Sequence, residues 1–207
     1  MSPLETLGWA LGTSFASGLN LYATVAAAGL LQQHGIIHLP PALQVLAQPL
    51  VWGIALALFV VEFVADKIPV VDSAWDTIHT FIRPPAAAVL AYSAFSDVPE
   101  GWKLGAALLA GSVALTSHGA KATTRAAANT SPEPFSNWIL SVFEDMLAVG
   151  LAWLAAEHPV LTGAIVVVLV VLCVLLIWRL FGFFKRVVAR IRGQPLAEAS
   201  GTGTSYG

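Results

Sequence analysis

The chain has 207 residues, of which 57% are hydrophobic and only 11% are charged, and its mean hydropathy is +0.77. Soluble globular proteins carry about 25% charged residues, so this composition excludes a water-soluble fold and indicates an all-α integral membrane protein. The net charge of −2, without a basic patch interleaved with aromatic residues, gives no indication of a nucleic-acid partner.

Continuous apolar runs recur along the chain, and a helix needs about 20 residues to cross a bilayer. The runs predict about six transmembrane or re-entrant helices, at residues 4–31, 45–65, 86–95, 104–116, 135–156 and 160–180. The third and fourth are short for a full crossing. No Lys or Arg precedes the first run, so we expect a retained helix rather than a cleaved signal peptide.

We expect one membrane-embedded domain over residues 1–192 and a disordered Gly/Ser/Thr-rich tail over residues 193–207. A basic cluster follows the last apolar run, at Lys185, Arg186, Arg190 and Arg192. The positive-inside rule places this end in the cytoplasm. Six crossings then place the N-terminus in the cytoplasm too, so we expect a multi-pass protein of the cell inner (cytoplasmic) membrane.

A short amphipathic helix is predicted between Pro69 and Pro84. Its apolar stripe contains Val71, Trp75, Ile78 and Ile82, and its polar stripe contains Asp72, Asp76, His79 and Arg83. This pattern suits a helix at the membrane surface or one folded back into a protein-lined cavity. For Asp72, Asp76 and His79 we favour a solvated face over a metal site. Asp66, Lys67 and Arg83 lie near predicted helix ends, where we favour headgroup anchors.

Two other features have plain interpretations. His34 and His38 have the spacing of a helical metal-ligand pair, but Gly35 and the prolines at 40 and 41 favour a polar connection. Cys173 lies in the most apolar run and is interpreted as an inert packing residue.

The sequence also contains a candidate internal repeat. SGLNLYATVAAA aligns with HGAKATTRAAAN, which pairs Asn20 with Lys121. Each copy is followed by a proline, a tryptophan and an apolar run that carries an acid, Glu62 in one half and Glu144 in the other. Three predicted helices separate the starts of the halves, residues 4–98 and 102–181, so we expect two inverted three-helix repeats. This arrangement is typical of transporters.

Three motifs resemble an uncharacterised bacterial membrane family, domain-of-unknown-function family 4126. They are GLNLY (18–22), VEFVADKIPVVDSAWDTIHTFIRPPAA (61–87) and SHGAKATTRAAANTSPEPFSNW (117–138). The resemblance covers most of the chain up to the fifth predicted helix. It implies a multi-spanning membrane domain, and it brings no activity, substrate or catalytic residue.

Charged side chains at membrane depth cost about 2.5–3.5 kcal/mol each on insertion scales, so they usually face a cavity or one another. His118, Lys121 and Arg125 share one helical face, which could pair with acids or bind an anion. Asn20 and Tyr22 could form interhelical hydrogen bonds or a cavity wall. The predicted substrate- or ion-binding residues are Asn20, Tyr22, Glu62, Asp66, Asp72, Asp76, His79, Arg83, His118, Lys121, Arg125, Asn129, Glu144 and Asp145. No catalytic residue, metal ligand or cofactor is predicted.

The leading hypothesis is a small transporter or channel-like protein that moves a small polar solute, ion or lipid-linked anion between the two halves. Glu62 and Glu144 would couple to protons or cations, and Lys121 and Arg125 would receive negative charge. One alternative is a membrane-embedded enzyme acting on lipid phosphates, although the sequence has no HExxH, GxSxG or Walker-type motif. Another is a non-catalytic scaffold whose polar stripes join helices or copies of a homo-oligomer within the bilayer.

Overall fold

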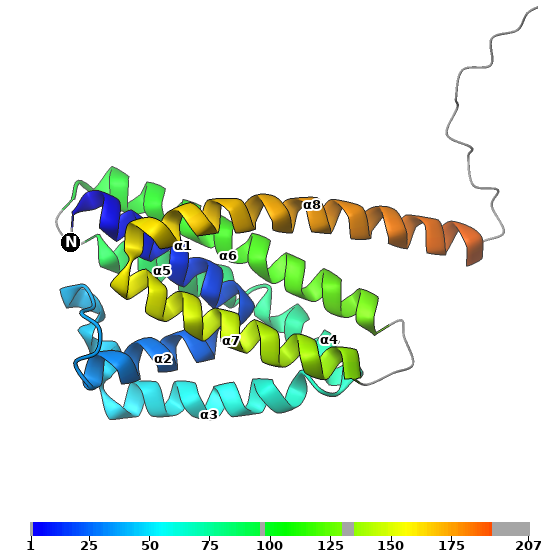
Figure 1. The fold of residues 1–207 in the computed structure, drawn as a ribbon, viewed down its shortest axis with the longest axis horizontal. Helices are drawn as coiled ribbons and strands as arrows, with labels where there is room; N and C mark the ends of the chain where they lie inside the picture. Colours follow the sequence, from blue (N-terminus) through cyan, green and yellow to red (C-terminus); the bar gives the residue numbers. More distant parts are fainter. Residues whose placement is uncertain (1, 96–97, 130–134, 192–207) are drawn as a thin grey trace, which may run out of the picture.

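The computed structural model describes residues 2–95, 98–129 and 135–191, and all regular structure in these ranges is helical. The elements are α1 (Pro3–Leu19), α2 (Leu21–Gln33), the 3-10 helix η1 (Pro41–Ala47), α3 (Pro49–Ala65), α4 (Pro69–His79), α5 (Arg83–Ala94), α6 (Glu100–Ala128), α7 (Phe135–Glu157) and α8 (Pro159–Ile191) (Figure 1). The all-α prediction is confirmed. The tail at residues 193–207 lies outside the described residues.

Helix α1 lies at the centre of the bundle and packs against α5, α6, α7 and α8. Its small residues allow this close approach, because a Cβ atom on Gly8 would lie 2.1 Å from the carbonyl oxygen of Pro159. A Cβ atom on Gly18 would lie 1.9 Å from Oγ of Ser117. The hydroxyl of Thr13 donates within its own helix, to the carbonyl oxygen of Trp9 at 2.9 Å, so burial leaves it satisfied.

The first predicted helix, residues 4–31, is broken in two at Asn20. This residue has extended backbone angles (φ −150°, ψ 103°), and its Oδ1 accepts from the backbone N–H of Ala23 at 2.9 Å as the N-cap of α2. Gly18 lies beside Ala114, in the middle of α6, whereas Gly29 lies beside Leu46 in η1. The chain therefore reverses direction at Asn20, and the start of α1 and the end of α2 lie at the same end of the bundle (Figure 1).

A second interruption separates α4 from α5 at residues 80–82. Pro84 and Pro85 sit in the first turn of α5, where the missing N–H groups would have no intrahelical partner. The two helices have 11 and 12 residues, so each rises about 16–18 Å at about 1.5 Å per residue. Neither is long enough to cross a bilayer alone.

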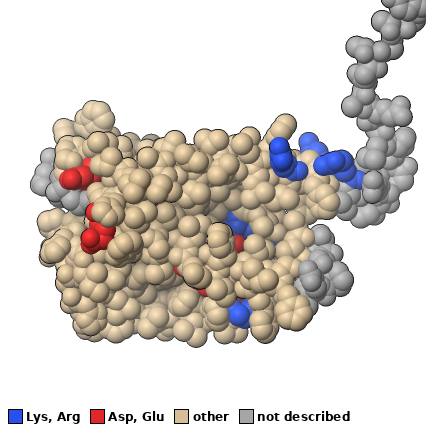
Figure 2. Space-filling view, viewed as in Figure 1, with Lys and Arg blue, Asp and Glu red and all other residues tan. Residues whose placement is uncertain are grey.

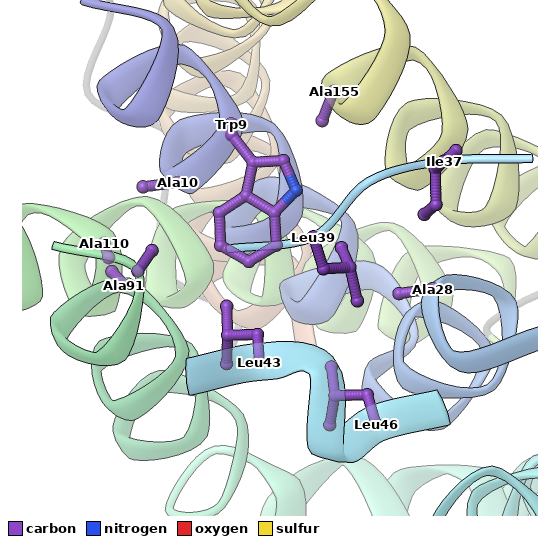
Figure 3. Packing of buried hydrophobic residues seen from close by; sticks show 11 residues of the cluster. Trp9, Ala10, Ala28, Ile37, Leu39, Leu43, Leu46, Ala91, Ala110 and Ala155 are labelled. Atoms are coloured by element: carbon purple, nitrogen blue, oxygen red, sulfur yellow. The ribbon is translucent and has the colours of Figure 1, made fainter. Parts of the chain in front are cut away.

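One of two apolar clusters of buried residues lies at the end of the bundle where α1 begins. Trp9 is buried there against Leu39, Leu43, Ala91 and Ala110 (Figure 3). Much of the outer surface is apolar as well, and charged residues gather at the two ends (Figure 2). Acidic residues lie at the end where α1 begins and basic residues lie along the last turns of α8.

Within the described part of the chain, α7 and α8 are long and apolar enough to cross a membrane. The bent pair of η1 and α3, which meet at 65°, adds a third if the two count as one span. Helix α7 matches the predicted residues 135–156 closely, whereas α6 and α8 extend well beyond the predicted runs. These helices support a membrane protein.

The predicted six-span inverted repeat is not confirmed. Trp9 of α1 and Ala110 of α6 belong to the same apolar cluster, so the two helices begin at the same end of the bundle. The start of α1 and the last turns of α8 lie at opposite ends (Figure 1). The physical reason is the turn at Asn20, which returns α2 to the end where α1 began.

Candidate functional site

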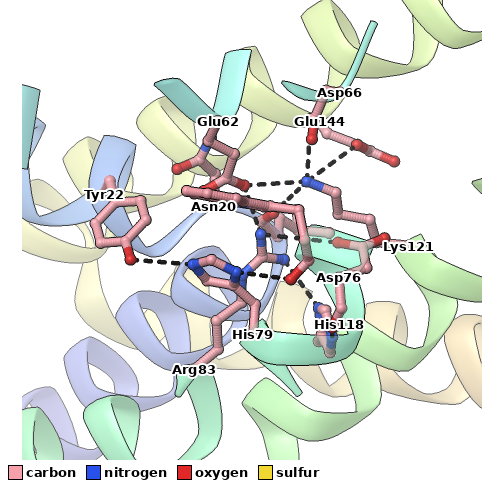
Figure 4. Close-up of polar contacts among 12 residues, drawn as sticks. Asn20, Tyr22, Glu62, Asp66, Asp76, His79, Arg83, His118, Lys121 and Glu144 are labelled. Atoms are coloured by element: carbon pink, nitrogen blue, oxygen red, sulfur yellow. Dashed lines mark hydrogen bonds and ion pairs between the residues drawn. The ribbon is translucent and has the colours of Figure 1, made fainter. Parts of the chain in front are cut away.

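The predicted site residues converge in the middle of the bundle (Figure 4). Twelve of the fourteen are at most 7% exposed, and Tyr22 and Asn129 are half-buried. They come from the junction of α1 and α2 and from α3, α4, α5, α6 and α7. The polar stripe between Asp72 and Arg83 and the polar face at His118, Lys121 and Arg125 are therefore parts of one buried network.

Lys121 of α6 joins the two acid-bearing helices. Its Nζ donates to Oε1 of Glu62 at 3.1 Å and to Oδ2 of Asp66 at 3.2 Å. Nζ also donates to the carbonyl oxygen of Leu19, the last residue of α1, at 3.2 Å. Oε2 of Glu144 lies 3.8 Å from the same nitrogen. Thus the acids of α3 and α7 share one ammonium group.

Arg125 lies one turn further along α6 and uses all three of its nitrogens. Nε and Nη2 donate to Oε2 of Glu144 at 3.1 and 2.7 Å. Nη2 also donates to Oδ2 of Asp66 at 2.8 Å, and Nη1 to the carbonyl oxygen of Asp66 at 2.9 Å. Oδ1 of Asp72 forms a further ion pair with Nη1, at 3.3 Å. The guanidinium group therefore joins α3, α4 and α7 to α6.

Arg83, the first residue of α5, is fully buried. Its Nη2 is paired with Oε1 of Glu62, and its Nη1 donates to the carbonyl oxygen of Gly18 at 2.8 Å. Nη1 also donates to Nδ1 of His118 at 2.9 Å. Oδ1 of Asp76 lies further off, 4.0 Å from Nη2. This one side chain connects the start of α5 with the end of α1.

The hydrogen bonds of His118 determine its tautomer. Because Nδ1 faces an arginine nitrogen, which can only donate, Nδ1 is the acceptor and Nε2 carries the proton. Nε2 then donates to the carbonyl oxygen of Asp76 at 3.0 Å and to Oγ1 of Thr80 at 2.9 Å. His118 is therefore a neutral link between α6 and the end of α4.

His79 has the opposite tautomer. Its Nδ1 lies 2.8 Å from the carbonyl oxygen of Trp75, an acceptor, so Nδ1 carries the proton. Nε2 accepts from the hydroxyl of Tyr22 at 3.0 Å. The pair joins α4 to α2. Burial lowers the pKa of His79, which keeps the ring neutral.

Side-chain amides complete the network. Nδ2 of Asn20 donates to Oδ1 of Asp145 at 2.8 Å, and Nδ2 of Asn129 lies 3.4 Å from Oδ2 of Asp72. Asn137 donates to Asn129 from the first turn of α7. Of the two roles left open for Asn20 and Tyr22, the hydrogen bond between helices is the one the structure contains.

The family model described as Domain of unknown function (DUF4126) matches residues 7–179, which include the whole network. The chain belongs to this family. No curated protein and no solved structure matches the DUF4126 chain.

Sequence reasoning missed three polar residues that support the site in this DUF4126 protein. Thr80 receives a hydrogen bond from His118, Asn137 contacts Asn129, and Ser117 donates to the carbonyl oxygen of Phe15 at 3.0 Å. Thr80 directly follows His79, a member of the polar stripe, and this position could have indicated that Thr80 belongs to the site. Asn137 and Ser117 carried none, because isolated Asn and Ser residues are common in apolar helices.

The preferred interpretation of α4 as a helix with a solvated polar face is wrong. Asp72, Asp76 and His79 are buried against the bundle, and the apolar side of the helix is outermost, with Val70 81% exposed. Burial is tolerated because Arg83 and Arg125 supply positive charge to the polar face. The apolar face then suits contact with lipid.

The anchor interpretation is also wrong for Asp66 and Arg83, both of which are fully buried. Their charges are paired inside the protein, so they need neither water nor headgroups. Lys67 is half-buried, and its Nζ donates to the carbonyl oxygen of Phe63 at 2.8 Å and lies 3.0 Å from the centre of that ring.

The buried network contains more acids than bases. Its carboxylates are Glu62, Asp66, Asp72, Asp76, Glu144 and Asp145, and its cations are Arg83, Lys121 and Arg125. Within the described residues, five carboxylate oxygens accept no hydrogen bond: Glu62 Oε2, Asp66 Oδ1, Asp72 Oδ1, Asp76 Oδ1 and Asp145 Oδ2. Such an excess of buried acid favours protons or a bound cation. It does not favour the anion that Lys121 and Arg125 were expected to receive, because both are already paired with carboxylates.

A cleft of about 230 Å³ reaches the network between α4 and α6, where Asp72, Asp76 and Arg125 line it with Thr77 and Thr80. Burial raises the pKa of Asp72 to about 6 and raises that of Asp76 as well. Both acids therefore take up protons more readily than an exposed aspartate.

The remaining predicted features lie outside the network. His34 caps the end of α2 and His38 follows in the loop, and both are exposed. Cys173 is half-buried against an apolar cluster that includes Val166. Among the residues that the structure describes, no group of three or more His, Cys, Asp or Glu side chains has the arrangement of a metal site.

Proposed function

We propose that this DUF4126 protein is a small membrane transporter or channel-like protein, in which a polar solute or ion passes beside the buried network. The observation that carries the proposal is the direct contact between two interrupted helices inside an apolar bundle. Arg83 at the α4–α5 break donates to Gly18 at the α1–α2 break over 2.8 Å. Across the same region, Tyr22 of α2 donates to His79 of α4 over 3.0 Å.

Helix interruptions are informative because they free backbone groups that lipid cannot satisfy. Transporters use such interruptions to place helix ends at a substrate site near the middle of the membrane. Here the carbonyl oxygens of Gly18 and Leu19 accept from Arg83 and Lys121, so the free end of α1 is held by ionised side chains. A change in the charge of these groups would alter how the broken ends are held.

The excess of acids supports the same proposal. Glu62 and Glu144 both lie beside Lys121, at 3.1 and 3.8 Å, so the charge state of one acid affects the other. Protons or cations that enter this network would be bound and released with the passing solute. The scaffold alternative uses the same contacts for stability alone and predicts no passage of solute.

Orientation follows from the distribution of exposed charge. Arg179, Lys185 and Arg186 lie at one end of the bundle, and Glu100 and Glu157 lie at the other. On the positive-inside rule, we infer a multi-pass protein of the cytoplasmic membrane whose α8 ends in the cytoplasm.

The test is a swelling assay on purified chain reconstituted in vesicles, read by stopped-flow light scattering, which reports the entry of any solute. The panel contains small neutral, anionic and cationic solutes, with valinomycin and potassium present to remove the membrane potential. We expect at least one solute to enter faster than in protein-free vesicles. Glu62→Gln should slow that entry at least tenfold, because the amide keeps an acceptor for Arg83 but carries no charge.

Glu157→Gln is the matched control, because Glu157 is exposed at the end of α7. Vesicles that contain this variant should take up the solute at the wild-type rate. Gel filtration and far-ultraviolet circular dichroism establish that each variant is folded. Entry at the protein-free rate for every solute, or equal entry through wild type and a folded Glu62→Gln variant, would count against transport through this network.

A further inference from the structure

We infer that the cleft between α4 and α6 binds a small monovalent cation at Asp76, so that the transported solute is a cation. This inference rests on the proposed function and specifies its substrate class. The site consists of the Asp76 carboxylate with the hydroxyls of Thr77 and Thr80, which line the cleft beside it.

The first argument is an acid that is buried without a full partner. Asp76 is 5% exposed, and its Oδ1 accepts no hydrogen bond from any residue in the described ranges. The Nη2 atom of Arg83 lies 4.0 Å from that oxygen, beyond hydrogen-bonding distance, and Arg83 is already paired with Glu62. An ionised carboxylate in this state attracts positive charge.

The second argument concerns the number of charges in the cleft. Asp72 also lines it, but this acid has Arg125 within 3.3 Å. Arg125 in turn gives its nitrogens to Glu144 and Asp66, which leaves it poorly placed to receive an anion. The nearest cation to Asp76 is Arg83, which lies 4.0 Å away and is shared with Glu62. Asp76 therefore contributes one weakly compensated negative charge, which matches a monovalent cation better than a divalent one.

The third argument is the chemistry and size of the lining. The hydroxyl of Thr77 donates to the carbonyl oxygen of Ser73 at 2.8 Å, and that of Thr80 to the carbonyl oxygen of Asp76 at 2.9 Å. Oγ1 of Thr80 also accepts from Nε2 of His118 at 2.9 Å, which leaves it one lone pair, whereas no residue in the described part of the chain donates to Oγ1 of Thr77. These hydroxyl oxygens can therefore still act as ligands, and oxygen ligands suit hard cations. The volume of about 230 Å³ is below the range of about 300–1,000 Å³ typical of clefts for drug-sized ligands.

Cation binding can be measured without transport. The purified chain in detergent is titrated with chlorides of ammonium, sodium and potassium, and its Tm is followed against N-methylglucamine chloride at equal ionic strength. We expect at least one small cation to raise Tm saturably by a few degrees, because a ligand that binds only the folded state stabilises it. Asp76→Asn should abolish the rise, since it keeps the shape of the side chain and removes the charge.

Glu157→Gln is the control, because Glu157 is exposed at the end of α7 and lies outside the buried network. This variant should fold and retain the cation-dependent rise. An equal rise in Asp76→Asn, or no difference from N-methylglucamine, would overturn the inference. A larger effect of magnesium would overturn the monovalent assignment.

The swelling assay separates this inference from the proposed function. Glu62-dependent entry of a neutral or anionic solute, without cation binding, would leave the transporter proposal standing and remove the cation. Cation binding that Asp76→Asn abolishes, with no solute entering any vesicle, would leave the binding site and remove transport.

Discussion

Arg83 donates from Nη1 to the carbonyl oxygen of Gly18 over 2.8 Å, which ties the first residue of α5 to the last turn of α1. Both residues stand at helix interruptions, and both are buried. The same guanidinium pairs with Glu62 of α3. The two broken helices are therefore held together by an ionised side chain rather than by apolar packing alone.

Replacing this arginine should destabilise the fold. Arg83→Gln would leave Lys121 as the one remaining cation beside Glu62 among the described residues, and it would remove the guanidinium donor from Gly18. Loss of one partner of a buried ion pair costs about 3–5 kcal/mol, so we expect a loss of that order in the free energy of unfolding in detergent. Arg179→Gln on the exposed face of α8 is the control and should change it little. Equal stability of the two variants would refute a holding role for Arg83.

Gly18 allows α1 to lie against α6. In Gly18→Ala the new Cβ would stand 2.3 Å from the carbonyl oxygen of Ala114, a backbone atom that cannot move away alone. We expect Tm to fall, with a cost of about 1–3 kcal/mol or more from overpacking. Gly150→Ala on α7 is the matched control, because nothing lies within 4 Å of its Cβ position. It should be neutral or gain up to about 1 kcal/mol in helix stability.

Arg125 and Glu144 should show strong energetic coupling, since Nη2 and Oε2 are 2.7 Å apart. Arg125→Gln removes the cation that three carboxylates share, and Glu144→Gln removes one of them. The double variant should therefore be more stable than the sum of the single effects predicts, by about 0.5–3 kcal/mol. Denaturation of the four proteins in one detergent measures this coupling. Additive losses would mean that the ion pair contributes no coupling free energy to the stability of the fold.

The titration of Asp72 should appear in the pH dependence of stability. Burial raises its pKa in the folded chain to about 6, above the ordinary value of 3.8. The stabilising effect of its bound proton is therefore complete below pH 3.8 and is lost as the pH rises through 6. Asp72→Asn keeps a neutral side chain, so its free energy of unfolding relative to wild type should increase between about pH 4 and 7, by about 1.4 kcal/mol for each pH unit between the two pKa values of Asp72. A difference that does not change with pH would show that Asp72 has no raised pKa.

Much of the site could be predicted from the sequence because charge is rare in this chain. Glu62, Lys121 and Glu144 stand out within apolar helices. Because charge is costly in lipid, these side chains are expected to pair with one another inside the protein. The long apolar helices α7 and α8 were equally visible, since each is a continuous run. Composition and periodicity were sufficient for these features.

The break at Asn20 could not be located in this way, whereas the prolines marked the one between α4 and α5. Asn20 lies within the predicted helix at residues 4–31, and its amide contacts Asp145, 125 residues further along the chain. The inward orientation of α4 has a similar origin, because the partners of Asp72 and Asp76 lie on α5 and α6. Periodicity identifies the two faces of a helix but not which face meets the protein.

The contact between Asn20 and Asp145 also bears on the order of assembly during synthesis. Helices α1 and α2 leave the ribosome before α7, which brings the carboxylate that accepts from the amide of Asn20. The amide at the turn of the α1–α2 hairpin therefore gains this acceptor only after α7 has been synthesised.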